Sequence, residues 1–390
     1  MFLAPLFDRN QFRILPGVAH VCAGGETPFL YRHQQAFEAY ARDKSSGSAG
    51  RLLLEAKSEQ ARDLVAALWQ VESRQIGFVS SVAEGVSILV ESLDWQEGDH
   101  ICVMNNEYPS VVAPFLKQGR VRFASDATLN GLKAIVNSKT RVIACSQVSY
   151  LNGERYSLPA LRRLADSVGA MLIVDFTQAS GYMPIDASLA DFAFSACYKW
   201  MLGMTGIAVA FWNTGLQPKW EPRTAGWYSI TDGTRYDAGI FLREGATRFT
   251  RGNPCHSGLY VLCEALDFLS QFKPEEIQGH VQSLTFQLLR ELDELGIAST
   301  TPVSNDRHGA SICVTGPGAR DVVKLLEDQK VYAWNGRGRI RFSFHGYNGS
   351  DDVASIAAAL RTFPEGLLAT LLASNSGASG HAAGQFAQGR

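Results

Sequence analysis

The stretch from Ser157 to Asp175 reads SLPALRRLADSVGAMLIVD and decides the fold class. Ser157 precedes a segment whose apolar residues recur at helical spacing, and Gly169 ends that segment, so the pattern predicts a helix. The run that follows is apolar up to its last residue, which is typical of a strand buried on both faces of a parallel sheet. A helix that leads into such a strand is the repeating unit of an α/β protein.

The same alternation of helix and short apolar strand extends from about residue 58 to 191. A long amphipathic helix is predicted over 258–272, and a mixture of helices and strands follows it. We therefore expect a large α/β domain over 15–265, whose N-terminal segment packs with a smaller α+β domain over 266–373. The tail, 374–390, is rich in Gly, Ser, Ala and Gln, and we expect it to be mobile.

Composition excludes several classes of partner. The 390 residues carry a formal net charge of -2, so no overall field favours nucleic acid or an anionic membrane. No stretch approaches the roughly 20 consecutive apolar residues of a membrane span. We expect a cytoplasmic protein that binds neither nucleic acid nor membranes.

Cysteine and histidine patterns argue against disulfides and metals. The seven cysteines are scattered, odd in number and never spaced as CxxC, so we expect reduced and mostly buried thiols. The eight histidines show no HExxH or comparable spacing. We expect no metal held by the protein.

Two charged residues are placed where a cofactor would bind. Ligands of open α/β sheets lie beyond the carboxyl ends of the strands, and Asp175 ends one predicted strand. Lys199 follows the next predicted strand, 24 positions further along the chain. A carboxylate keeps a pyridine nitrogen protonated, and a partly desolvated lysine forms a Schiff base, which together is the chemistry of pyridoxal 5'-phosphate (PLP). Taken alone, each residue has an ordinary alternative, a helix N-cap for Asp175 and a solvated lysine for Lys199.

A strand-to-helix turn is a candidate phosphate site. The strand Ile76–Val79 is followed by Ser80 and Ser81 and then by an amphipathic helix. The N–H groups and dipole of such a helix start favour a phosphate. A plain capping box between Ser81 and Glu84 is the alternative, although one turn can serve both purposes.

Six segments in this order resemble the class V aminotransferase family of fold-type I PLP enzymes, which includes cysteine desulfurases, kynureninases and isopenicillin N epimerases. The segments are VSSVAEGVSIL (79–89), NNEYPSVVAPF (105–115), VDFTQASG (174–181), SACYKWMLGMTGIAVAF (195–211), RFTRGNPCHSGLYVL (248–262) and RIRFSFHGYNGSDDV (339–353). The resemblance covers roughly residues 15–365. It implies a large domain with a mostly parallel seven-stranded sheet, a smaller α+β C-terminal domain, and PLP as cofactor.

The resemblance also implies roles for single residues around the cofactor. Lys199 would carry PLP as a Schiff base, Asp175 would hold the pyridine nitrogen, and Tyr108 would stack on the ring. Gln178 would donate to the phenolic oxygen of the ring. Phosphate contacts would come from Ser81, Val82, Ala83, Tyr198 and Asn253. Because Asn253 would reach the phosphate of the neighbouring subunit, a homodimer with shared active sites is implied.

Substrate contacts are implied near both ends of the chain. Arg341 would clamp the substrate carboxylate through a bidentate pair, for which arginine geometry is well suited. Arg339 lies two residues earlier on the same strand face and is the competing assignment. Gly25, within CAGGETP (22–28), would belong to an N-terminal substrate loop. The adjacent Glu26 hints at an amine or another donor on the substrate, and simple surface exposure is its alternative.

The chain departs from the desulfurase pattern at the nucleophile. Desulfurases place a cysteine on a loop shortly before the carboxylate arginine, but Tyr332–Gly338 contains none, and no cysteine follows Cys313. Persulfide chemistry of that type is therefore disfavoured. Tyr198 also stands where desulfurases have a histidine, and Ala196 where many members have a serine.

We therefore expect a PLP-dependent enzyme that acts on an amino acid or amine through an external aldimine, with Lys199 as the general base. Transamination is the first expectation, because the family's cysteine is missing. Elimination of a β-substituent, including C–S cleavage, kynureninase-like hydrolysis and epimerisation stay open. A dinucleotide-binding oxidoreductase is disfavoured, since no GxGxxG follows an early strand.

Overall fold

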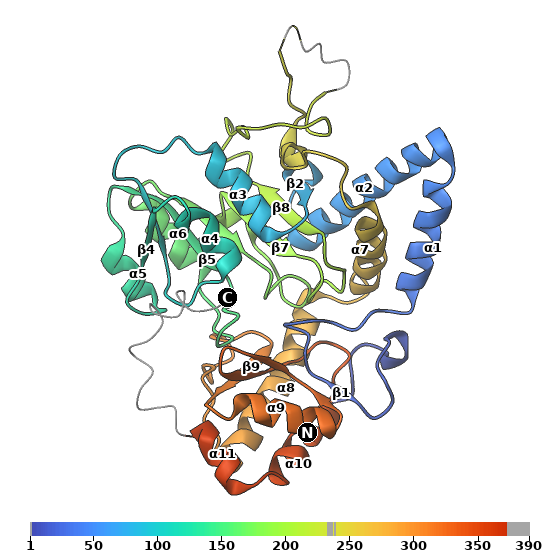
Figure 1. The fold of residues 1–390 in the computed structure, drawn as a ribbon, viewed down its shortest axis with the longest axis vertical. Coiled ribbons are helices and arrows are strands. Elements are labelled where there is room, and N and C mark those ends of the chain that lie inside the picture. Colours follow the sequence, from blue (N-terminus) through green and yellow to red (C-terminus); the bar gives the residue numbers. More distant parts are fainter. Residues whose placement is uncertain (1, 232–236, 238, 373–390) are drawn as a thin grey trace. The chain divides into compact units, whose positions relative to one another are not determined.

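The computed structural model describes residues 2–231, 237 and 239–372 (Figure 1). The tail at 374–390, for which the sequence predicts mobility, lies outside the described residues. The chain forms two compact units. What we call the large unit is Phe29–Gln147 with Tyr156–Lys273, and the small unit is Met1–Pro28, Val148–Arg155 and Pro274–Arg390.

The large unit contains seven α-helices and seven strands among its described residues. The helices are α1 (Arg32–Lys44), α2 (Gly47–Trp69), α3 (Val82–Ser92), α4 (Pro109–Leu116), α5 (Leu129–Ile135), α6 (Leu158–Asp166) and α7 (His256–Leu269). The strands are β2 (Ile76–Val79), β3 (His100–Val103), β4 (Val121–Phe123), β5 (Thr140–Ser146), β6 (Met171–Asp175), β7 (Phe192–Ala196) and β8 (Ala208–Trp212).

These strands form one sheet in the order β2-β8-β7-β6-β5-β3-β4. The strands from β7 to β4 run parallel to one another, whereas β8 runs antiparallel to both β7 and β2. The expected α/β fold with a mostly parallel seven-stranded sheet is confirmed. Helix α3 packs on β7 and β8 (Figure 1). Its apolar face joins the buried residues of these strands in one core.

The segment that predicted the fold class has the structure expected of it. The Ser157 hydroxyl accepts a hydrogen bond from the Ala160 N–H and caps α6. Gly169 has a positive φ of 70°, the left-handed conformation that lets a helix end in a tight turn. All five residues of β6 are buried, because parallel strands of this type are covered on both faces.

The small unit is an α+β assembly, as expected. Its helices are α8 (Pro274–Glu294), α9 (Ala319–Asp328), α10 (Ser350–Arg361) and α11 (Glu365–Leu372). Its strands are β1 (Ala19–His20), β9 (Ser311–Thr315), β10 (Val331–Tyr332), β11 (Trp334–Gly336) and β12 (Arg339–Ser343). Strands β11, β12 and β9 form an antiparallel sheet, and β1 pairs with β10, which fixes the N-terminal segment to this unit.

A two-residue turn joins β11 to β12. Arg337 and Gly338 have φ angles of 55° and 68°, the left-handed pair that closes a tight β-hairpin. Arg339 begins the strand immediately after this turn. The turn thereby sets the position of the arginines that follow.

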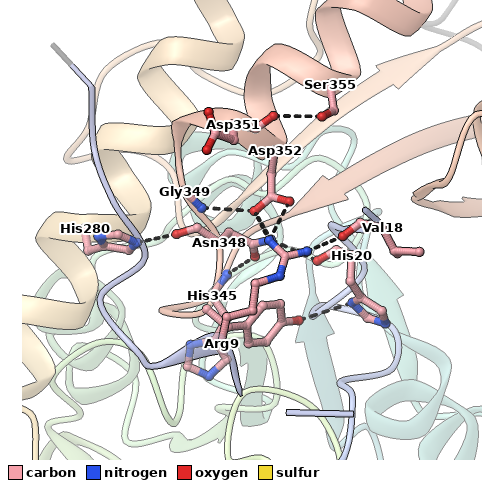
Figure 2. A network of polar contacts seen from close by, with 11 residues as sticks. Arg9, Val18, His20, His280, His345, Asn348, Gly349, Asp351, Asp352 and Ser355 are labelled. Atoms are coloured by element: carbon pink, nitrogen blue, oxygen red, sulfur yellow. Dashed lines mark hydrogen bonds and ion pairs between the residues drawn. The ribbon is translucent and has the colours of Figure 1, made fainter. Parts of the chain in front are cut away.

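A polar network holds the chain where it leaves β12 (Figure 2). The Asp352 carboxylate accepts hydrogen bonds from Arg9, from the Asn348 amide and from the Gly349 N–H, each at 3.0 Å. His280 contacts the Asn348 carbonyl at 2.8 Å. The network therefore ties the N-terminal segment, α8 and the start of α10 to one turn.

No helix in the described part of the chain has both the length and the apolar character that crossing a bilayer requires.

Candidate active site

Asp175 and Lys199 lie at the carboxyl ends of neighbouring parallel strands. Asp175 is the last residue of β6 and pairs with Phe194 of β7, and Lys199 lies three residues beyond the end of β7. Their exposed fractions are 4% and 6%, so both charged groups are buried. Burial raises the pKa of Asp175, while hydrogen bonds from Thr177 and the charge of Lys199 lower it. A buried carboxylate and a buried amine therefore act on each other at one edge of the sheet.

Two tyrosine rings face the Lys199 amine. The Lys199 Nζ lies 5.7 Å from the centre of the Tyr108 ring and 5.4 Å from that of Tyr198. Tyr108 is the N-cap residue of α4, in the connection that follows β3. The structure thus brings Tyr108 together with Tyr198 and Lys199, although the sequence places them in two separate segments.

Gln178 has a fixed amide orientation. Its Oε1 accepts a hydrogen bond of 3.0 Å from the indole N–H of Trp200, and its exposed fraction is 5%. Because an indole nitrogen is only a donor, the oxygen must face Trp200 and the amide NH₂ must face the other way. That orientation presents a donor, which is what the predicted contact with a phenolic oxygen requires.

The start of α3 combines a cap with helix N–H groups. The Ser81 hydroxyl accepts a hydrogen bond from the Glu84 N–H at 3.2 Å. The Glu84 carboxylate, however, accepts from the N–H and hydroxyl of Ser80, both at 2.6 Å, so the reciprocal bond of the predicted capping box goes to Ser80. Val82 and Ala83 are the first two residues of the helix, where N–H groups have no acceptor within the helix.

Asn253 lines a cavity in its own chain. The cavity has a volume of about 270 Å³, and Ser80, Glu84 and the loop from Phe249 to Cys255 contribute to its wall. The Asn253 Oδ1 accepts a hydrogen bond of 2.6 Å from Arg51. The predicted role of Asn253 across a subunit interface stays a prediction.

Glu107 belongs to the candidate site but was missed by sequence reasoning. Its carboxyl accepts hydrogen bonds from the Ser146 N–H at 2.6 Å, the Ser146 hydroxyl at 2.5 Å and the Tyr108 N–H at 2.6 Å. Burial is the main cause that raises the pKa of Glu107 to about 7. The sequence did hold one indication of this role: Glu107 directly precedes Tyr108, in a segment that resembles the cofactor-stacking loop of the family.

The predicted substrate residues all belong to the small unit. Arg339 and Arg341 both donate to the carbonyl oxygen of Tyr150, at 3.0 and 2.9 Å. The Gly25 backbone packs so closely on Trp334 that an added Cβ would lie 2.4 Å from a ring carbon. The guanidinium carbon of Arg341 lies 5.8 Å from the centre of the same ring. Gly25 and Arg341 are thus linked through Trp334, and Tyr150 is a second residue that sequence reasoning missed.

All seven cysteines are free thiols, and the β11–β12 hairpin contains none. Cys22 and Cys255 are partly exposed, whereas the other five are buried. Burial raises the pKa of Cys197, the thiol nearest to Lys199 in sequence, to about 12. A thiol held in its protonated form is a poor nucleophile.

The residues of the large unit fit PLP. The buried Asp175 carboxylate suits a protonated ring nitrogen, Lys199 suits the aldehyde carbon, and the Tyr108 face suits the ring. The start of α3 suits the phosphate. Four features of one cofactor are matched within one unit.

Comparison with known proteins agrees with this fit. The chain is 24% identical to a probable cysteine desulfurase of Methanothermobacter thermautotrophicus, over 90% of this chain and 96% of that protein. It is 23% identical to the uncharacterized aminotransferase YcbU of Bacillus subtilis, over 76% and 81% of the two chains.

A solved structure of the cystine C–S lyase C-DES, in complex with its product cysteine persulfide, shares the fold with a TM-score of 0.82. It is 22% identical and covers 90% of this chain and 98% of its own. In another structure of C-DES, glycine is covalently linked to the PLP cofactor. The aminotransferase class-V family model matches residues 30–356. The family resemblance and the cofactor expected from the sequence are therefore confirmed: the chain belongs to the aminotransferase class-V family, which is PLP-dependent.

Proposed function

We propose that this chain is a PLP-dependent C–S lyase that acts on an amino acid by β-elimination. The overall reaction converts a cysteine S-derivative and water into a thiol, pyruvate and ammonium. The names of its relatives support C–S cleavage more than the transamination that the sequence first suggested. The proposal thus takes up one of the alternatives that the sequence left open.

The composition of the β11–β12 hairpin carries this proposal. A desulfurase of the type that the chain resembles needs a cysteine here to accept the sulfur, and the turn is instead Arg337–Gly338. Without that acceptor, the sulfur leaves with its substituent as a free thiol or persulfide. Elimination needs only a group that removes the α-proton and an acidic ring that stabilises the resulting charge.

We assign roles to the residues of the large unit accordingly. When bound, PLP supplies a protonated ring that withdraws electrons from the α-carbon. Asp175 holds the proton on the ring nitrogen, Tyr108 packs against the ring face, and Gln178 donates to the phenolic oxygen. Lys199 holds the cofactor through its Nζ and, once released, removes the α-proton with the same atom. The phosphate is bound by Ser81, Val82, Ala83 and Tyr198.

The residues of the small unit bind the substrate in this proposal. The Arg341 guanidinium holds the α-carboxylate, and Trp334, packed on Gly25, orients that guanidinium.

Transamination is the second candidate, because one relative is named an aminotransferase. Both reactions begin with removal of the same α-proton. In elimination the amino nitrogen of the substrate is released as ammonium, whereas in transamination it stays on the cofactor.

The experiment compares the two outcomes on the same holoenzyme. L-cystine and S-methyl-L-cysteine are supplied as elimination substrates, and L-alanine and L-glutamate as amino donors. Pyruvate and thiol release without accumulation of pyridoxamine phosphate supports the lyase. Conversion of the bound cofactor to pyridoxamine phosphate by the amino donors, with no thiol release, contradicts it.

Two controls refine that experiment. Lys199→Ala is expected to abolish turnover with every substrate, since it removes the base. Alkylation of the exposed thiols with iodoacetamide is expected to leave thiol release unchanged. A loss of activity that follows alkylation of one cysteine would point to a nucleophilic thiol instead.

We also propose that the enzyme is a homodimer in which Asn253 reaches the phosphate bound by its partner. Support comes from the exposed position of Asn253 in a segment that resembles the family's crossing loop. Dilution to monomers should then release PLP, and Asn253→Ala should weaken PLP binding. Monomers that retain PLP would contradict the shared site. The cytoplasmic location expected from the sequence stays a prediction.

A further inference from the structure

Two buried arginines of the small unit converge on one oxygen atom. Arg339 and Arg341 are two positions apart on β12, so their side chains point to the same face of the strand. Arg339 Nη2 and Arg341 Nη1 both donate to the carbonyl oxygen of Tyr150, at 3.0 and 2.9 Å. Their exposed fractions are 2% and 3%. Two positive charges are therefore held close together, away from water.

Arg339 has no anion beside it in the described part of the chain. It forms no ion pair there, and its Nε and Nη1 atoms are buried without a hydrogen-bond partner. Burial is the main cause that lowers the pKa of Arg339, and the charges of Arg341 and Arg337 lower it further. Buried charges in proteins are normally paired, because an uncompensated one costs free energy.

The contacts that Arg339 does make compensate its charge only in part. Its guanidinium carbon lies 5.0 Å from the centre of the Tyr150 ring, a cation–π contact. Arg337 also contacts this tyrosine, through the phenolic oxygen and the ring face. The Tyr150 carbonyl has a donor in Arg341, whereas two of the Arg339 nitrogens have no acceptor among the described residues. The second guanidinium exceeds what the local structure requires.

We propose that Arg339 and Arg341 together bind a ligand with two anionic groups, and that the substrate is an amino acid carrying a second carboxylate. The assignment to substrate rests on the proposed function, in which Arg341 holds the α-carboxylate. Arg339 then holds the carboxylate at the far end of the substituent. The Nε and Nη1 groups of Arg339, which have no acceptor within the described chain, are the donors available to that carboxylate, while Nη2 can stay on the Tyr150 carbonyl. Arg339 and Arg341 thus act together, rather than competing for one carboxylate.

The test compares succinate with butyrate, which have the same number of carbon atoms but two carboxylates and one. Their dissociation constants are measured by calorimetry on the holoenzyme and on its Arg339→Met and Arg341→Met variants. The wild type should bind succinate at least tenfold more tightly than butyrate. Arg339→Met should remove that preference while leaving butyrate binding unchanged, and Arg341→Met should weaken the binding of both.

Other patterns overturn the proposal. If the wild type shows no preference for succinate, Arg339 does not bind a second anion. If Arg339→Met weakens both ligands by the same factor, the two arginines share a single carboxylate. Arg320→Met is the matched control, because it removes an exposed arginine of the same unit and should change neither dissociation constant.

A second measurement does not depend on the reaction that the enzyme catalyses. Arg339→Met removes a buried charge that lacks an anion, so the melting temperature of the ligand-free holoenzyme should stay equal or rise. Succinate should raise the melting temperature of the wild type and no longer raise that of the variant. A melting temperature several degrees lower in the ligand-free variant would show that Arg339 is structural, and would overturn the proposal.

The two proposals can fail separately. If transamination replaces C–S cleavage, the succinate preference and its loss in Arg339→Met are still expected, because they concern binding alone. If C–S cleavage is found but substrates with one and two carboxylates react with equal kcat/KM, only the two-anion site is contradicted.

Discussion

Ser146 and Asp175 lie directly opposite each other in the parallel pairing of β5 and β6. The Glu107 carboxyl accepts hydrogen bonds from both the N–H and the hydroxyl of Ser146, and a third from the N–H of Tyr108. The Glu107 carboxyl thereby joins the loop that carries Tyr108 to the strand beside Asp175. Glu107 is in this arrangement a positioning residue.

Replacing Glu107 by glutamine should change how stability depends on pH. A glutamate of the unfolded chain loses its proton near pH 4.5, whereas burial raises the pKa of Glu107 to about 7. Between these pH values the folded protein binds more protons than the unfolded one, so this residue's contribution to stability falls as pH rises. Glu107→Gln cannot titrate, so it removes this pH-dependent fall in stability. The substitution also replaces one hydrogen-bond acceptor by a donor, which lowers the free energy of unfolding by about 1 kcal/mol.

The measurement is thermal unfolding of the wild type and Glu107→Gln between pH 5 and pH 8. The variant should be less stable than the wild type at pH 5 and more stable at pH 8, because the wild type loses about 2–3 kcal/mol of this residue's contribution over that range. A difference in stability that stays constant over this range would show that Glu107 does not titrate within it.

Asp175→Asn should separate cofactor binding from catalysis. A neutral amide cannot keep the ring nitrogen protonated, although it fits the same space. We expect PLP to stay bound, with turnover lower by at least about a hundredfold, or about 2.7 kcal/mol of activation free energy. The absorbance of the bound cofactor and steady-state rates measure the two effects. Asp186→Asn, an exposed change in the connection between β6 and β7, is the control and should leave both unchanged.

Local sequence patterns predicted much of the large unit. The segment that forms α6 and β6 carries its own start, period and stop signals within 19 residues, so no distant contact was needed to recognise it. The position of Asp175 at the end of a strand followed from the same pattern. Lys199 could be added because the end of each parallel strand faces the same edge of the sheet.

Contacts between distant segments left no local signal. Arg339 donates to the carbonyl of Tyr150, 189 positions away, and a backbone carbonyl has no sequence signature. The Glu107 carboxyl reaches Ser146 only because β3 and β5 are neighbours in the sheet. The Glu84 carboxylate accepts a hydrogen bond from the N–H of Ser80 and not from that of Ser81. The backbone conformation of a single turn decides between these two donors, and the capping-box sequence pattern does not predict that conformation.

Protonation of His33 should destabilise the large unit in acid. The side chain is buried, lies edge-on to Phe29 at 5.1 Å between ring centres, and both of its ring nitrogens lack a hydrogen-bond partner among the described residues. Burial lowers the pKa of His33 to about 4. Below pH 6.5 the unfolded chain therefore binds a proton that the folded protein excludes, so stability is lost as pH falls from 6.5 toward 4.

The loss attributable to His33 is up to about 3 kcal/mol at pH 4. Unfolding temperatures of the wild type and His33→Phe between pH 4.5 and pH 7.5 measure it. The variant should lose less stability on acidification. Some dependence should remain, because burial also lowers the pKa of His20 in the small unit to about 4. Equal slopes in the two proteins would exclude His33 as a source of acid sensitivity.

Gly25→Ala should impair substrate binding through Trp334. The new methyl group would lie 2.4 Å from a carbon of the Trp334 ring, so the ring must move, and this ring lies against Arg341. We expect KM for carboxylate substrates to rise by about tenfold, which corresponds to about 1.4 kcal/mol, with a smaller change in kcat. Gly279→Ala is the control, since nothing lies within 4 Å of its added methyl group. An unchanged KM in Gly25→Ala would mean that Trp334 does not position Arg341.

Asp352→Asn should destabilise the small unit more than the same change at the neighbouring Asp351. The Asp352 carboxylate is buried and accepts hydrogen bonds from Arg9, Asn348 and Gly349 (Figure 2), whereas the Asp351 side chain is exposed. Removing one partner of a buried ion pair costs about 3–5 kcal/mol, and we expect about 2–3 kcal/mol because the Arg9 side chain is 32% exposed. Urea unfolding measures both variants. Because both substitutions lie on adjacent residues of the first turn of α10, equal losses would mean that the charge of that helix turn matters and the buried network does not.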